Sequence, residues 1–150
     1  MNRLEGEVAR AQRYGRPLVF VVTDLDGFKE LNDRHGHAAG DEALIAFANV
    51  LAGSLRQPDD AFRIGGDEFA FLLSEATEQD ARSVVERVQA LLGRQSTGEE
   101  DRWLGDINAS FGFATCPHDA SDPTTLFRLA DEAQYAAKRS GSGLGFVARA

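Results

Sequence analysis

The segment FRIGGDEFAFLL, residues 62–73, constrains the fold of this chain more than any other stretch. Two apolar runs with strand character flank the sequence Gly65-Gly66-Asp67-Glu68. Glycine inside a strand pattern marks a tight turn, a bulge or the close approach of another backbone or a ligand. The pattern predicts a β-hairpin, and because the two strands of a hairpin are antiparallel, a purely parallel sheet is excluded.

Helical and strand patterns alternate along the rest of the chain. The unbroken apolar run 18–22 is typical of a central strand that is covered on both faces. The resulting order is α-β-α-α-β-β-α-β-α-β, which predicts an α+β fold, a mixed α/β sandwich of helices on a sheet of about five strands. Beside the central strand and the hairpin, helices are predicted within 1–17, 28–34, 41–55, 81–92 and 123–141, strands at 107–115 and 144–148, and a polar loop at 94–103.

Length and charge narrow the functional classes. A chain of 150 residues is long enough for a real core, and we expect a single domain over residues 1–150. The formal net charge of −8 argues against general nucleic-acid binding, which needs clustered Lys and Arg. No apolar run approaches the roughly 20 residues that cross a membrane, so we expect no membrane contact by this domain. The single cysteine, Cys116, cannot form an internal disulfide, which fits a cytoplasmic location.

Acidic residues gather at the ends of two predicted strands. Strand 18–23 leads into Asp24 and Asp26, and the hairpin carries Asp67 and Glu68. If these strands are neighbours, the carboxylates converge with no basic residue close by in sequence, and burying such a cluster unpaired is very costly. Oxygen ligands select hard cations such as Mg²⁺ or Mn²⁺, and the adjacent glycines let a phosphate reach backbone N–H groups. A purely structural acidic turn and Ca²⁺ binding stay open at this point, although no EF-hand loop supports calcium.

Long motifs around these carboxylates resemble one family. The stretches DLDGFKELNDRHGHAAGDEAL (24–44) and RQPDDAFRIGGDEF (56–69) resemble the GGDEF domains of bacterial diguanylate cyclases. The segments INASFGFA and LADEAQYAAKRSG resemble a later strand and the late helix of that family, so the resemblance runs from about residue 12 to residue 141. It implies a fold similar to nucleotidyl cyclases and polymerase palm domains. It also implies that two GTP give cyclic di-GMP and two pyrophosphates, with metal ions neutralising charge.

The resemblance implies a role for each matching residue. Asp24, Asp67 and the backbone carbonyl of Leu25 match the metal ligands, and Glu68 matches a position required for turnover, as a metal ligand or as the base for the hydroxyl. A carboxylate at the guanine accepts from N1–H and N2–H₂, which adenine does not offer. The residues that match substrate contacts are Phe28 and Lys29 under the phosphates, Asn32 and Asp41 at the guanine, Gly65 and Gly66 at the triphosphate turn, and Lys138 at a phosphate.

The resemblance also implies regulation and assembly. Arg56 and Asp59 match the RxxD inhibitory site of the family, where the product cyclic di-GMP meets arginine through its guanine edges and phosphates. The product needs two nucleotides that face each other, so a homodimer with two-fold symmetry is implied for catalysis. The expected partners are therefore GTP, cyclic di-GMP and a second copy of the chain.

The chain departs from the family pattern at several places. Ser142 stands where the family has an arginine that contacts phosphates, and Gln134 stands where an apolar residue is expected. A lost charge-assisted contact costs about 1.5–3 kcal/mol, roughly ten- to hundredfold in affinity or rate. The Thr-Gly-Leu loop that opens the family is absent, so we expect a domain excised from a longer signalling protein and lacking its start. Two functions stay open: an active, product-inhibited diguanylate cyclase, and a weak or inactive GGDEF domain that binds GTP or cyclic di-GMP as a regulatory module.

Four residues have simpler structural interpretations. We expect Asp26 to cap the helix that begins near Phe28. We expect Arg63 to support the hairpin rather than to touch substrate. Lys138, near the end of its helix, also complements the helix dipole, and Cys116 is expected to be inert.

Overall fold

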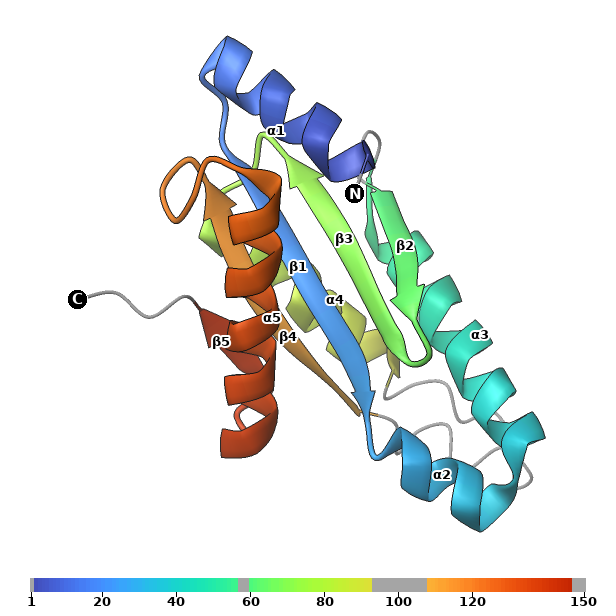
Figure 1. Ribbon diagram of the computed structural model, residues 1–150. Coiled ribbons are helices and arrows are strands. Elements are labelled where there is room, and N and C mark those ends of the chain that lie inside the picture. The colour runs from blue at the N-terminus through green and yellow to red at the C-terminus, as the bar shows by residue number, and fades with distance from the viewer. Residues whose placement is uncertain (1, 57–59, 93–107, 147–150) are drawn as a thin grey trace.

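A computed structural model describes residues 2–56, 60–92 and 108–146, and in these ranges five helices pack around one five-stranded sheet (Figure 1). The order of elements is the predicted one, so the α+β class is confirmed. The predicted loop 94–103 lies outside the described residues. The elements are α1 (Asn2–Tyr14), β1 (Leu18–Asp26), α2 (Phe28–His35), α3 (His37–Ser54), β2 (Asp60–Gly65), β3 (Glu68–Ser74), α4 (Glu78–Leu92), β4 (Asn108–Cys116), α5 (Pro123–Ser140) and β5 (Leu144–Phe146).

The sheet is mixed, with strand order β2-β3-β1-β4-β5. The apolar strand β1 is central and runs antiparallel to both β3 and β4, whereas β5 pairs with β4 in parallel. The hairpin of β2 and β3 is confirmed: Gly65 pairs with Glu68 across a turn of two residues, Gly66 and Asp67. A shift of register between Arg63 and Gly65 bends β2 just before this turn.

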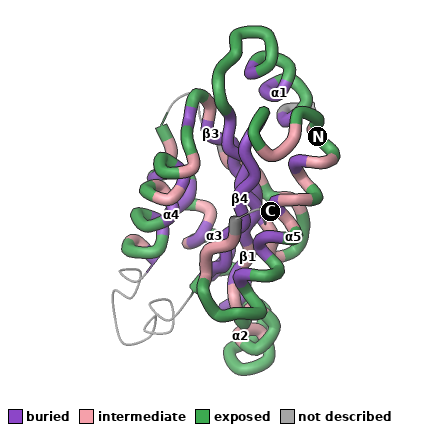
Figure 2. Tube along the Cα trace, turned by 90° about the vertical axis from the view of Figure 1, so that its left-hand side faces the viewer, coloured by how far each residue is buried: buried purple, intermediate pink, exposed green. Residues whose placement is uncertain are grey.

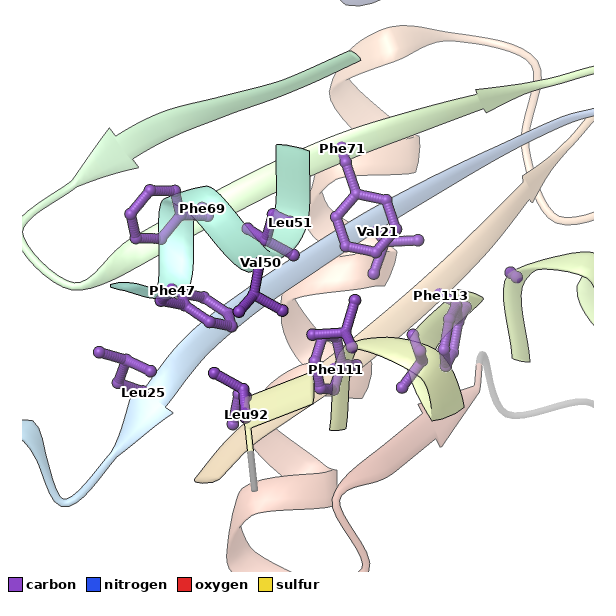
Figure 3. Packing of buried hydrophobic residues seen from close by; sticks show 14 of the residues in the cluster. Val21, Leu25, Phe47, Val50, Leu51, Phe69, Phe71, Leu92, Phe111 and Phe113 are labelled. Carbon is purple, nitrogen blue, oxygen red and sulfur yellow. The ribbon is translucent and has the colours of Figure 1, made fainter. Parts of the chain in front are cut away.

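Two hydrophobic clusters cover the two faces of the sheet, because side chains alternate along each strand. On one face, Val21 of β1 packs with Phe47 of α3 and Phe71 of β3, in the cluster shown in Figure 3. On the other face, Phe20 packs in a cluster with Leu126 of α5, and α1 joins the same side. Figure 2 shows the buried strands between α4 on one side and α5 on the other. The even-numbered side chains of β1 therefore face α1 and α5.

Helix α5 lies unusually close to the sheet because two glycines face it. A Cβ atom at Gly112 of β4 would lie 2.1 Å from the carbonyl oxygen of Ala130, and one at Gly145 of β5 would lie 2.0 Å from that of Ala133. Either contact is far inside van der Waals distance. The absence of these side chains lets the backbone of α5 rest on β4 and β5, and this fixes the height of its side chains above β1.

Two helices begin earlier than the sequence pattern predicts. Helix α3 begins at His37, because Gly36, with φ of 90°, makes the whole break between α2 and α3 by itself. Helix α4 begins at Glu78, because Thr77 and Asp80 cap it reciprocally: the Asp80 carboxylate accepts from the Thr77 amide at 2.8 Å, and Thr77 Oγ1 accepts from the Asp80 amide at 3.2 Å. Within the described ranges, none of the helices has both the length and the apolar character needed to span a bilayer.

Candidate active site

The predicted carboxylates meet at one end of the central strand pair. Asp24 of β1 and Glu68 of β3 are direct partners in the antiparallel register, and opposite residues of such a pair place their Cβ atoms about 5 Å apart. Asp67 precedes Glu68 in the hairpin turn. Asp24 has the parity of Phe20, so its side chain projects towards α5. The expectation that the two acidic strands are neighbours is confirmed.

Helix α5 supplies the polar partners of Asp24. The Gln134 amide donates from Nε2 to Asp24 Oδ1 at 2.6 Å, and the Lys138 ammonium donates from Nζ to Asp24 Oδ2 at 3.3 Å. The third polar residue of this helix face, Asp131, acts electrostatically on Glu68. The spacing of 131, 134 and 138 places the three on one side of a helix, a signal that the sequence contained but that was not used to predict this grouping.

Burial, together with the crowding of acids, shifts several pKa values at this site. Burial raises the pKa of Asp24, and repulsion from Asp67 adds to the rise, while Lys138 opposes it. Burial likewise raises the pKa of Glu68, followed by repulsion from Asp131 and Asp24. Partial burial alone would lower the pKa of Lys138, but attraction to Asp24 and its acidic neighbours outweighs that effect and raises it. The site is therefore rich in negative charge that a further cation would relieve.

Asp26 does not cap α2, so that expectation is wrong. Its Oδ1 accepts a hydrogen bond from Ser110 Oγ of β4 at 2.8 Å. The N-cap of α2 is Gly27, in the left-handed region with φ of 71°, and in the described structure no side chain caps the helix. Strand pairing explains this contact, because Asp26 pairs with Asn108 of β4, and Ser110 lies two residues further along β4 on the same face of the sheet.

The residues matched to phosphate binding lie in the first turn of α2. Phe28 is half-buried against the core cluster beneath α3, and Lys29 is exposed. Since no side chain of the described residues caps this helix, the backbone N–H groups of its first turn remain available to an anion. The aromatic ring anchors the turn while the lysine reaches solvent.

The two residues matched to guanine binding are Asn32 and Asp41. Gly40 has no side chain, and this lets α2 pack closely on α3 beside them. Asn32 of α2 packs against the first turn of α3, and a Cβ at Gly40 would lie 1.8 Å from Asn32 Oδ1. Asp41, the next residue, is exposed. In the described structure Asn32 Oδ1 is buried without a hydrogen-bond partner. The exposed carboxylate of Asp41 suits a ligand with adjacent N–H donors.

The glycines of the hairpin face open space. Among the described residues, none has a heavy atom within 4 Å of a Cβ built at Gly65 or Gly66. Arg63 supports the turn, as expected: its Nε donates to the carbonyl oxygens of Gly65 and Gly66 at 3.1 and 3.0 Å. The turn is thus held by its own strand, and the two glycines leave open space where other residues would carry a side chain.

A separate cavity of about 170 Å³ lies on the other side of the sheet, between the end of α3 and α4. It is lined by Arg56 and also by Arg87 of α4, whose Nη1 donates to the Ser54 carbonyl at 3.0 Å. Asp59 lies outside the described residues. Arg87 was not singled out in the sequence, because a lone arginine in an amphipathic helix carries no signal until its neighbours in space are known.

Ser142 stabilises the turn that follows α5 through its hydrogen bonds. Its Oγ donates to the Leu144 carbonyl oxygen at 3.0 Å and receives a hydrogen bond from Ser140 Oγ at 3.1 Å. Arg139 lies over the ring of Tyr135, 5.8 Å from its centroid. These contacts do not bring Ser142 or Arg139 to the carboxylates of β1 and β3.

The donor set fits a hard cation. Asp24 and Asp67 offer carboxylate oxygens, and the Leu25 side chain is buried in the core with 1% exposure, so only its main chain is available as a ligand. Within the described ranges, no three His, Cys, Asp or Glu side chains form a ready-made metal cluster. An open, oxygen-only set of two carboxylates and a carbonyl suits Mg²⁺, which keeps positions for water and substrate phosphates.

The fold and this site define a nucleotidyl cyclase-like domain: five helices around a mixed sheet, with acidic residues where the central strand meets a hairpin. The family described as "Diguanylate cyclase, GGDEF domain" matches residues 1–143. The chain belongs to this family, and the resemblance drawn from its motifs is confirmed. Members of the family are generally metal-dependent.

Individual relatives agree with this assignment. The chain is 36% identical over 135 residues to the diguanylate cyclase DosC of Escherichia coli (strain K12), an overlap of 90% of this chain but 29% of DosC. The crystal structure of the GGDEF domain of TpbB (YfiN) from Pseudomonas aeruginosa superposes with a TM-score of 0.88 at 35% identity, covering 99% of this chain and 93% of that one. The GGDEF domain of DgcB from Caulobacter crescentus, solved in complex with c-di-GMP, gives 0.87 at 28% identity, covering 97% and 86%. The chain thus spans less than a third of the length of DosC.

Proposed function

We propose that this domain condenses two GTP molecules into cyclic di-GMP and two pyrophosphates. The observation that carries the proposal is the meeting of Asp24 with Asp67 and Glu68 at the hairpin, on the sheet face that α5 covers. Such a cluster is costly unless cations neutralise it, and those cations can in turn bind phosphates. Family membership supports the same reaction.

The triphosphate is proposed to lie between α2 and the hairpin. The uncapped first turn of α2 offers backbone N–H groups, and Lys29 adds a positive charge beside them. Gly65 and Gly66 leave room for phosphate oxygens to approach the hairpin backbone. Lys138, which contacts Asp24 in this structure, is within reach of a phosphate bound next to that carboxylate.

Guanine is proposed to bind at Asn32 and Asp41. The Asp41 carboxylate accepts from the N1–H and N2–H₂ groups of the base, and the Asn32 amide donates to the acceptors of the base. Adenine lacks that pair of adjacent donors. This arrangement favours GTP over ATP.

In the proposed reaction, the 3′-oxygen of each nucleotide attacks the α-phosphorus of the other. One P–O bond forms, the bond to pyrophosphate breaks, and the hydroxyl proton leaves. Asp24, Asp67 and the Leu25 carbonyl would hold Mg²⁺ or Mn²⁺, which would supply charge neutralisation at the phosphates. Glu68 serves the step as base for the hydroxyl or as a further ligand, the two roles that its place opposite Asp24 allows.

Two copies of the domain are proposed to form the catalytic unit. Each chain binds one GTP, and the product joins two nucleotides through two equivalent bonds. A C2 homodimer presents the 3′-hydroxyl of each nucleotide to the α-phosphorus of the other, so each chain contributes half of the site. We place the reaction in the cytoplasm, where GTP is available and the buried free thiol of Cys116 stays reduced.

Product inhibition is proposed at the cavity lined by Arg56 and Arg87, together with Asp59. Two guanidinium groups facing one cavity can meet guanine edges and phosphates through paired hydrogen bonds. The DgcB domain, solved in complex with c-di-GMP, supports product binding to this fold. The site lies across the sheet from Asp24, so its occupant does not compete directly for GTP.

One observation favours a second candidate, a weak cyclase that acts mainly as a GTP- or cyclic di-GMP-binding module. Ser142 occupies the expected arginine position and is engaged with Leu144 and Ser140 in a turn. A missing phosphate contact predicts roughly ten- to hundredfold slower turnover. Ser142→Arg distinguishes the two: a gain in turnover above tenfold indicates a weakened enzyme, and no gain indicates that the site works without this contact.

The proposed function is tested with Asp67→Asn. The variant loses one carboxylate oxygen and the negative charge in a partly exposed turn, so the fold is expected to survive while cyclic di-GMP formation from GTP and Mg²⁺ falls more than tenfold. Circular dichroism checks the fold, and chromatography of nucleotides measures turnover. Retention of more than a tenth of wild-type turnover would show that Asp67 has no role as a metal ligand.

A further inference from the structure

Gln134 is a polar residue in a buried position of α5. The residue is 4% exposed, whereas the pattern of the GGDEF family has an apolar residue there. A buried primary amide destabilises the fold unless its donors and acceptors are paired. The Nε2 atom donates to Asp24 Oδ1 at 2.6 Å, a short hydrogen bond to a charged acceptor. Gln134, which stands in place of an apolar side chain, therefore contacts Asp24, the carboxylate at the centre of the site.

Both partners of this hydrogen bond sit on rigid elements. Asp24 belongs to the central strand, between β3 and β4. The backbone of Gln134 is pressed against β4, because a Cβ at Gly112 would lie only 2.3 Å from the Gln134 amide nitrogen. Neither backbone can move away without disturbing the sheet. The amide therefore restrains the rotation of the Asp24 carboxylate, as supporting residues around metal ligands do.

The two oxygens of Asp24 are held differently. Oδ1 is bound by the buried, neutral amide of Gln134, and Oδ2 is bound at 3.3 Å by Lys138, whose side chain is 41% exposed. A neutral donor orients a carboxylate without cancelling its charge. A half-exposed lysine is a partner that a metal ion or a phosphate can replace. The geometry keeps Oδ1 in place and presents Oδ2 for exchange.

We propose that Gln134 is a positioning residue that orients Asp24 for the catalytic divalent cation, through the hydrogen bond from Nε2 to Oδ1. The proposal rests on the proposed function, since it assumes that Asp24 binds the cation. It assigns to this chain a support that an apolar residue at position 134 cannot provide. Loss of such a support typically weakens metal affinity about tenfold or more.

The test uses Gln134→Met, which keeps the length and flexibility of the side chain but has no donor. The matched control is Gln12→Met, which removes a hydrogen bond of similar length, 2.7 Å from Gln12 Nε2 to the Ser121 carbonyl oxygen, at the opposite end of the sheet. Mn²⁺ binding is titrated by electron paramagnetic resonance in the presence of saturating 3′-deoxy-GTP. This nucleotide lacks the attacking hydroxyl, so binding is measured without turnover.

We expect Mn²⁺ affinity to fall about tenfold in Gln134→Met and to stay within twofold of wild type in Gln12→Met. Thermal stability of Gln134→Met is expected to fall modestly, because Asp24 Oδ1 loses its donor while an apolar side chain takes the place of the buried amide. In turnover assays the Mg²⁺ requirement should rise while the KM for GTP at saturating Mg²⁺ stays within twofold. A purely structural role predicts lower stability with unchanged metal affinity, so the Mn²⁺ titration separates the two roles.

The outcomes separate this inference from the proposed function. If wild type binds no Mn²⁺ with 3′-deoxy-GTP, the proposed function fails. If wild type binds Mn²⁺ and Gln134→Met binds it equally well, only the role of Gln134 is overturned. Should Gln134→Met fail to fold, Gln134→Leu, the apolar type expected at this position, is measured in the same way and judged by the same criteria.

Discussion

Replacing Gly112 by alanine tests how α5 is held above the catalytic strand. The added methyl group would lie 2.1 Å from the Ala130 carbonyl oxygen and 2.3 Å from the Gln134 amide nitrogen, both backbone atoms. To reach ordinary contact, α5 would have to retreat by roughly 1 Å. Overpacking of this kind costs about 1–3 kcal/mol of unfolding free energy. For a chain of this size, each kcal/mol lowers Tm by about 2–4 °C, so we expect a decrease of several degrees.

The assay is urea unfolding followed by circular dichroism, with two matched glycine controls. Gly53→Ala, in α3, places its methyl group in open space and should stabilise the helix by up to about 1 kcal/mol. Gly66→Ala also meets no atom of the described chain, so we expect a stable fold with weaker GTP binding, since the methyl group enters the proposed phosphate path. Equal unfolding free energies for Gly112→Ala and wild type would refute the close packing of α5 on β4.

Two further predictions concern the ligand sites. Asp41→Ser should relax the preference for GTP over ATP by at least tenfold, because a hydroxyl cannot accept two hydrogen bonds from guanine; a competition assay with an unchanged preference would rule out this role for Asp41. Arg87→Ala should weaken inhibition by added cyclic di-GMP about tenfold or more while leaving initial turnover unchanged, because a charged hydrogen bond is worth about 1.5–3 kcal/mol. Unaltered inhibition in a dose-response measurement would exclude Arg87 from the inhibitory site.

The sequence predicted the features that depend on local pattern. The hairpin follows from Gly65 and Gly66 between two apolar runs, and the central position of β1 follows from five successive apolar residues. The order of elements was correct for the same reason. Start positions were less accurate, because a single glycine of positive φ, Gly36, and the cap formed by Thr77 and Asp80 outweigh the apolar periodicity of α3 and α4.

The site was only partly predictable. Asp24 and Glu68 could be placed together once their strands were assumed to be neighbours. The hydrogen-bond partners of the β1 carboxylates could not be predicted in this way. Ser110 lies 84 residues from its partner Asp26 in the sequence, and Gln134 lies 110 residues from its partner Asp24. Their contacts depend on the strand order and on the height of α5, which tertiary packing sets. The domain boundaries, the metal and the homodimer stay predictions.

The central claim is that two copies of this domain join two GTP molecules through the carboxylates of β1 and the hairpin. The most direct measurement is the product stoichiometry of the chain fused to a leucine zipper, which raises the local concentration of the second copy. The reaction contains GTP and Mg²⁺ and no phosphodiesterase, so that the product accumulates and can be quantified. We predict one cyclic di-GMP for every two pyrophosphates, at a rate above that of the unfused chain. Pyrophosphate without cyclic di-GMP, or no turnover by a folded zipper fusion that binds GTP, would contradict the account.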